Sequence, residues 1–119
     1  MKIPRIYTGG DGRSHFEEID LPVASRGLGS EQSAPMRVKN AVFLSSTLEA
    51  NKAIGRMHPA SKRLLVVKLS GEIEITVGDG SKRVFGPGHI HILDDTHGEG
   101  HRGRHLTEEG ATLMLELED

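Results

Sequence analysis

The clearest pattern in the chain is the alternation of apolar and polar residues in its second half. Residues 72–77 read EIEITV, and residues 89–93 alternate in the same way. A repeat of two residues places the apolar side chains on one face of a strand, so both segments are predicted to be half-buried strands. Residues 64–69 are apolar at every position except Lys68. That segment is predicted to be a strand that needs cover on both faces.

Turn signals separate these segments and extend the pattern. Glycine stands at position 71, Gly-Asp-Gly at 78–80 and Gly-Pro-Gly at 86–88, and residues 22–36 are rich in Ser, Gly, Pro and Ala, as in a long loop. Short strands at this spacing predict one all-β domain over residues 1–119, a barrel or sandwich of about eight to ten strands with little helix. The other predicted strands are 82–85 and 113–118, with weaker candidates at 14–21, 37–46 and 53–58.

Length and charge narrow the class of protein. A chain of 119 residues is one domain, and 15 basic against 17 acidic residues give a formal charge of −2, so we expect no nucleic-acid partner. There is no cysteine, which excludes disulfides, thiolate metal sites and cysteine nucleophiles. The chain has no apolar run near the ~20 residues of a membrane helix, and its first residues lack the apolar core of a signal peptide. We therefore expect no membrane association and a cytoplasmic location.

Histidine is the unusual component. The chain has seven, and five of them lie between positions 89 and 105. Histidine is the commonest metal ligand and titrates near neutral pH, so this clustering favours a metal site or an acid–base site. The segment HGEGH at 97–101 is not the helical zinc motif, because its glutamate stands at the wrong place and its glycines disfavour a helix.

Residues 55–72 resemble the first motif of the cupins. That motif reads H-x-H, three or four residues, Glu or Gln, then six residues and Gly. The sequence here is GRMHPASKRL followed by LVVKLSGE. With Gly71 as the anchor, His58 takes the place of the first histidine, Ala60 that of the second, and Leu64 that of the Glu or Gln.

Residues 85–101 resemble the second cupin motif. They begin FGPGH, and His101 best fits the place of the last metal histidine, with His97 close enough to compete. The opening residues 7–16 are also similar to the lead-in of a group of small single-domain cupins. The resemblance implies one cupin domain over residues 1–119, with the double-stranded β-helix or jelly-roll barrel of that family.

The resemblance also implies a metal centre of three histidines and one Glu or Gln around Fe, Mn, Zn or Ni. Ala60 and Leu64 have no donor atom, so two of the four ligand places are lost. Two alternatives follow: the domain is metal-free, or a further histidine completes a site with His58 and His101. His97 and His105 are the substitutes, since counting in twos from His101 places His105 on the same strand face.

The same counting nominates residues for a pocket. We expect His58 and His101 to face each other inside the barrel, where they are the candidate catalytic residues. The candidate ligand-binding residues are Arg56, Leu64 and Lys68. A guanidinium can hold a carboxylate or phosphate at two points, and a lysine of depressed pKa can act as a base. For Arg56 and Lys68 the alternative is a position in solvent.

Three further polar residues are expected to lie outside the pocket. His91 is expected to point outward, because Ile90 and Ile92 are expected to take the interior face. Asp94 and Asp95 are adjacent and so point to opposite faces of a strand. We expect them to shape the turn that follows.

The sequence supports several functions. The first is a small-molecule-binding cupin of unassigned substrate, with acid–base or weak metal-dependent activity around His58 and His101. The second is a metal-dependent enzyme of the dioxygenase or isomerase type that uses a substitute histidine. A metal-free enzyme similar to the sugar epimerases of this superfold, and a structural or regulatory dimer without a ligand, complete the set. We expect a homodimer, because both faces of residues 64–69 need cover.

Overall fold

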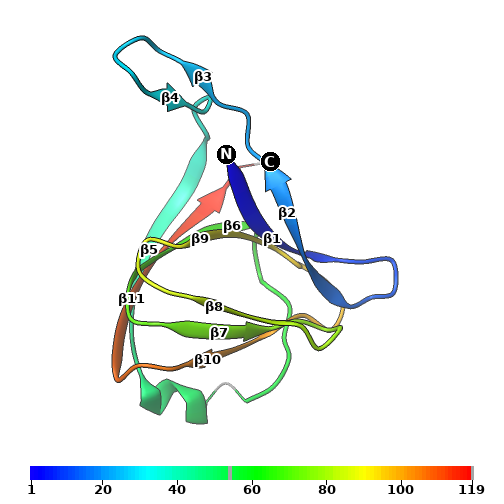
Figure 1. The fold of residues 1–119 in the computed structure, drawn as a ribbon. Coiled ribbons are helices and arrows are strands. Elements are labelled where there is room, and N and C mark those ends of the chain that lie inside the picture. Colours follow the sequence, from blue (N-terminus) through cyan, green and yellow to red (C-terminus); the bar gives the residue numbers. More distant parts are fainter. Residues whose placement is uncertain (54, 119) are drawn as a thin grey trace.

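The computed structural model describes residues 1–53 and 55–118, and these form an all-β domain, as predicted (Figure 1). The described part includes one short 3₁₀ helix, η1 (Leu48–Lys52), and no helix long and apolar enough to cross a membrane. The strands are β1 (Lys2–Thr8), β2 (Ser14–Asp20), β3 (Ala24–Ser25), β4 (Glu31–Gln32), β5 (Val38–Thr47), β6 (Leu64–Ser70), β7 (Ile73–Thr76), β8 (Lys82–Phe85), β9 (Ile90–Asp94), β10 (Arg102–His105) and β11 (Glu109–Leu117).

Two sheets make up the body of the domain. The larger has six strands in the order β2-β1-β9-β6-β11-β5, and the smaller has three in the order β10-β7-β8. Neighbouring strands are antiparallel except β1 and β9, which are parallel. The hairpin β3–β4 projects away from this body (Figure 1). Within the described residues the sheets stay separate and do not close into a barrel.

The core lies where the two sheets face each other. Ile6, Val66 and Leu93 of the six-stranded sheet pack in one cluster with Ile75 and Phe85 of the three-stranded sheet. All five are less than a tenth exposed. Each strand contributes alternate residues to this cluster, because successive side chains of a strand point to opposite faces.

Most of the predicted strands are present. The alternating segments and the continuous apolar segment all form strands, because their apolar side chains fill one or both faces of a sheet. The predictions at 14–21, 37–46, 64–69, 72–77, 82–85, 89–93 and 113–118 correspond to β2, β5, β6, β7, β8, β9 and β11.

The prediction of a strand at 53–58 is wrong for the described part of that segment. Only His58 pairs there, in a single bridge to His101, and Ile54 lies outside the described residues. Strand β10 agrees with the strand assumed in counting from His101 to His105, although its sequence RGRH has no apolar alternation that would have identified it. The predicted loop at 22–36 contains the short hairpin β3–β4.

Candidate functional site

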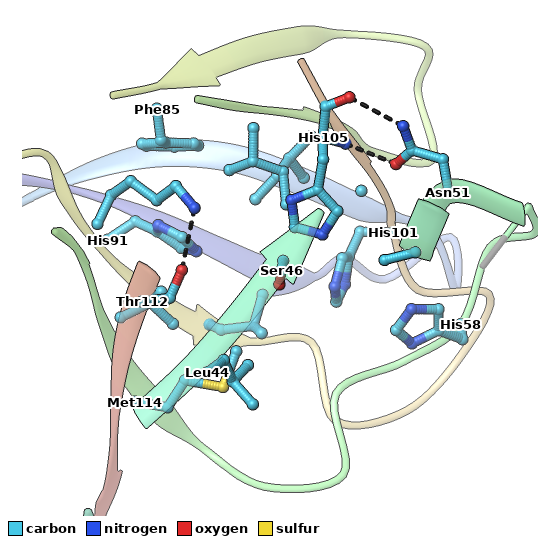
Figure 2. A pocket seen from close by; sticks show the side chains of 17 residues that line it. Leu44, Ser46, Asn51, His58, Phe85, His91, His101, His105, Thr112 and Met114 are labelled. Atoms are coloured by element: carbon cyan, nitrogen blue, oxygen red, sulfur yellow. Dashed lines mark hydrogen bonds between the residues drawn. The ribbon is translucent and has the colours of Figure 1, made fainter. Parts of the chain in front are cut away.

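A cavity of about 330 Å³ lies between the two sheets (Figure 2). Strands of both sheets supply its walls, and the segments around η1 and residues 58 and 101 supply one end. Apolar and polar side chains line it in equal number. The lining residues are Leu44, Ser46, Ala50, Asn51, His58, Val66, Lys68, Ile73, Ile75, Phe85, His91, Leu93, His101, Gly103, His105, Thr112 and Met114. A volume of this size suits a small organic ligand.

The structure brings His58 and His101 together at this cavity. Each backbone amide donates to the other residue's carbonyl, with N···O distances of 2.8 and 2.9 Å. The two ring centroids are 5.0 Å apart. Gly100 makes this approach possible: its φ is 82°, and a Cβ there would collide with the backbone carbonyl of His58. The pairing of the two histidines is therefore a property of the backbone, which holds both rings at the cavity.

The imidazole of His101 is oriented by a buried carboxylate. His101 Nδ1 lies 2.7 Å from Oδ2 of Asp95, which is fully buried. The same oxygen accepts a hydrogen bond of 2.7 Å from the hydroxyl of Ser14, and the amide of Ala60 donates to the Asp95 carbonyl. Because a carboxylate accepts, Nδ1 carries the proton and Nε2 keeps its lone pair. His101 thus presents a basic nitrogen from a fixed ring.

Asp95 corrects the expectation that the acidic pair only shapes a turn. Asp94 does face outward, where Arg5 donates to its carboxylate at 2.6 Å. Asp95 instead points to the interior. Counting in twos from His91 through Leu93 reaches Asp95, so the alternation of β9 would have identified it if it had been extended past the strand.

The expectation that His91 points outward is wrong. His91 is 3% exposed, lines the cavity and lies against Phe85, with 4.4 Å between ring centroids. Burial, helped by the nearby His101, lowers the pKa of His91 to about 4. His91 is inward because it pairs with Val66, which belongs to the core cluster.

His105 also reaches the cavity, held by a residue that the sequence did not single out. Asn51 of η1 donates from its side-chain amide to the carbonyl of His105 at 2.9 Å, and its Oδ1 accepts from the His105 amide at 2.7 Å (Figure 2). Burial and the charge of Lys68 lower the pKa of His105. Asn51 has the role of a positioning residue, and a lone asparagine in a polar segment carries no signal that would have revealed it.

Lys68 points into the cavity. The residue is 3% exposed and belongs to the cavity wall. Its Nζ donates to the hydroxyl of Thr112 at 3.1 Å. Burial lowers the pKa of Lys68. Of the two alternatives for this residue, the structure has the inward one.

Four other residues that the sequence nominated lie outside the cavity wall. Arg56 is exposed and does not line the cavity. His97 is exposed on a loop, where its carbonyl accepts a hydrogen bond from Thr8. Ala60 belongs to the buried core, and Leu64 packs against that core. An apolar wall does exist, but Val66, Ile73 and Ile75 are among the residues that form it.

The donor set does not fit a four-ligand metal centre of the cupin type. Ala60 and Leu64 offer no donor atom, and both pack in or against the core. Among residues 1–53 and 55–118, no three histidine, aspartate or glutamate side chains are grouped so that they could hold a metal ion. The titratable groups that line this cavity are four imidazoles and one lysine.

Comparison of the sequence with protein-family models and with curated proteins finds no match.

Proposed function

We propose that this chain is a cupin-type domain that binds a small organic molecule between its sheets and transfers a proton through His101. The observation that carries the proposal is the buried pair of His101 Nδ1 and Asp95 Oδ2 at 2.7 Å beside a cavity of about 330 Å³. A histidine held by a buried carboxylate is an arrangement that enzymes use for general acid–base catalysis. Two facing sheets and the glycine-anchored pairing of residues 58 and 101 support the cupin-type jelly roll.

The proton transfer uses the two nitrogens of His101 differently. Nε2 accepts a proton from a carbon or oxygen of the bound molecule, while Nδ1 keeps its hydrogen bond to Asp95. The imidazolium that forms is stabilised by the Asp95 carboxylate, which Ser14 holds in place. Nε2 then returns the proton to another atom of the ligand.

His58 is the second candidate for proton transfer. Its ring lies beside that of His101, and its Nδ1 is 3.2 Å from the carbonyl of Pro59. No buried carboxylate orients it in the described structure. We therefore assign the base to His101 and a supporting role at the cavity entrance to His58.

Hydrogen exchange in D₂O tests this proposal. The probes are 2-hexanone and 2-oxohexanoate, whose hydrogens next to the carbonyl group can be replaced by deuterium, as followed by ¹H NMR. We expect the protein to accelerate exchange of at least one probe, and His101→Gln to remove about 10²–10⁴-fold of that acceleration. His97→Gln is the matched control and keeps it. Exchange at the buffer rate, or equal exchange with His101→Gln, would refute the proposal.

A homodimer remains part of the proposal. Phe43, Leu113, Val67 and Ile90 are register neighbours across β5, β11, β6 and β9, on the face of the six-stranded sheet opposite the cavity. Phe43 is 73% exposed. A row of apolar side chains that crosses four strands is typical of an interaction surface, and a second copy offers the same row.

Sedimentation tests the dimer. The wild type is expected to sediment with twice the mass of one chain, and Phe43→Glu is expected to sediment as a monomer, because a buried unpaired carboxylate opposes association. Leu28→Glu, at a fully exposed position between β3 and β4, is the control and stays dimeric. A monomeric wild type at micromolar concentration contradicts the prediction.

A further inference from the structure

Lys68 is a buried cation whose neighbours do not neutralise it. The only described hydrogen-bond partner of its ammonium is the neutral hydroxyl of Thr112, at 3.1 Å from Nζ. No described carboxylate lies within ion-pair distance of Nζ, and the residue is 3% exposed. Burying an ammonium group without a counter-charge is unfavourable, and an apolar side chain at this place would cost less. An anion bound in the cavity would supply the counter-charge that the described residues do not.

The titratable side chains of the cavity wall around Lys68 are also all basic. The described residues that line the cavity include four histidines and one lysine, but no aspartate or glutamate. In Figure 2, Thr112 and His91 lie toward one end of the cavity and His58 and His101 toward the other, with His105 between them. Since Nζ bonds to Thr112, the ammonium lies at the end away from His58. An anion bound there would leave the rest of a ligand extending toward His101.

Backbone geometry makes room for the ammonium. Gly110 on β11 lies beside it, and a Cβ at this glycine would stand 3.0 Å from Nζ. A side chain at position 110 would therefore displace the ammonium from this end of the cavity. Gly110 and Thr112 lie on the same face of β11, so a single strand supplies both the space and the hydroxyl.

A basic groove adjoins the cavity. This second hollow, of about 380 Å³, shares Asn51 and Gly103 with the cavity wall. Its charged side chains are three cations and one carboxylate: Lys82, Arg102, Arg104 and Glu74. The whole chain has a net charge of −2, so this surplus of cations is local. A positive groove beside a cavity raises the concentration of anions at its entrance.

We propose that the cavity binds a small organic carboxylate, with its negative group against Nζ of Lys68 and the hydroxyl of Thr112. The apolar body of the ligand lies along Ile75 and Phe85, and the basic groove attracts it from solution. This inference rests on the proposed function only in taking the cavity as the ligand site. A charge-assisted hydrogen bond and the neutralisation of a buried cation both favour the carboxylate over a neutral group.

The test compares ligands that differ only in charge. Cyclohexanecarboxylate, benzoate and hexanoate are titrated into the protein by calorimetry, each beside its neutral amide. We expect at least one carboxylate to bind about ten- to a hundredfold more tightly than its amide. Lys68→Met is expected to remove this preference, since methionine keeps an unbranched side chain, one atom shorter, and loses the charge. Lys62→Met removes an exposed lysine and is the matched control.

Two further measurements keep the result unambiguous. In the wild type, carboxylate binding must shift the ¹³Cε signal of Lys68, which needs no variant to fold. Exchange of 2-hexanone, a probe without a carboxylate, reports on the base without the anion site, so a failure of the exchange assay and a failure of anion binding are separate results. Binding of no carboxylate, equal binding of the amides, or an unchanged preference in folded Lys68→Met would overturn the inference.

Discussion

Two histidine environments in this domain have opposite electrostatics. His15 of β2 lies at the surface between two carboxylates: its Nε2 is 3.0 Å from both oxygens of Asp11, and its Nδ1 is 3.3 Å from Asp79. The hydrogen bond to Asp11 raises the pKa of His15. His91 lies in the cavity wall, and burial lowers its pKa to about 4. The protonated form of the same residue type is therefore favoured in one region and disfavoured in the other.

The two regions differ in how far their basic groups are paired with carboxylates of the chain. The surface cluster of His15, Asp11 and Asp79 pairs its histidine with two carboxylates of the chain and joins the turn after β1 to the turn after β7. The cavity wall does not balance its charges. Only His101 has a carboxylate partner there, and Lys68 has none among the described residues. The surface histidine already has its counter-charges within the chain, whereas a wall of unpaired basic groups is suited to receive an anionic ligand.

The largest effect on stability is expected from removing the buried carboxylate of the cavity region, and it should far exceed the effect of removing an exposed carboxylate of the surface cluster. Asp95→Ala takes away the partner of His101 and Ser14 at a fully buried position, and we expect a loss of about 3–5 kcal/mol in the free energy of unfolding. Asp11→Ala removes an exposed carboxylate and is expected to change the stability far less, because solvent screens that pair. Urea unfolding at pH 7 measures both. Equal losses in the two variants would show that the two regions do not differ in this way.

The second effect is the loss of folding stability at acidic pH. Below pH about 6.5 an unfolded histidine binds a proton, whereas folded His91 stays neutral until pH about 4, so acid favours the unfolded chain in this window. Between these two pH values, His91 should cost the wild type on the order of 3 kcal/mol of stability. His91→Leu should flatten this part of the curve, as followed by urea unfolding at a series of pH values.

His97→Leu is the control for the acid experiment. His97 is exposed, and its side chain forms no hydrogen bond in the described structure, so its replacement should leave the pH dependence as in the wild type. An acid slope that persists in His91→Leu would mean that other groups cause it.

The sequence predicted the sheets better than the site. Alternation of apolar residues identified β7 and β9, because a strand that buries one face has an apolar residue at every second position. Counting from Gly71 and Gly88 also placed His58 and His101 in one region, since glycines mark the turns that set the register. These features depend on local patterns, which a single sequence displays.

The parts that the sequence left open or missed depend on contacts between distant segments. Whether Lys68 faces the cavity or solvent is decided by the pairing of β6 with β11, which no local pattern records. Asp95 has meaning only through Ser14 and His101, and Ser14 lies 81 residues away in the chain. Arg56 was nominated by extending a strand that does not form, so its predicted direction had no basis.

The smallest effect should come from the surface cluster, and its sign is opposite to that of His91. Because the pKa of His15 is raised in the folded chain, its contribution to stability is fully present below the unfolded pKa of about 6.5 and is lost as the pH rises through the folded pKa. His15→Gln should therefore lower the urea midpoint slightly near pH 6 and leave it unchanged near pH 9. The difference should shrink in high salt, which screens exposed pairs.

¹H NMR titration measures the pKa of His15 directly: the His15 ring should titrate above an ordinary histidine, and Asp11→Asn should lower its pKa. A ring that titrates below the ordinary value would contradict the raised pKa of His15 and remove the contrast with the cavity.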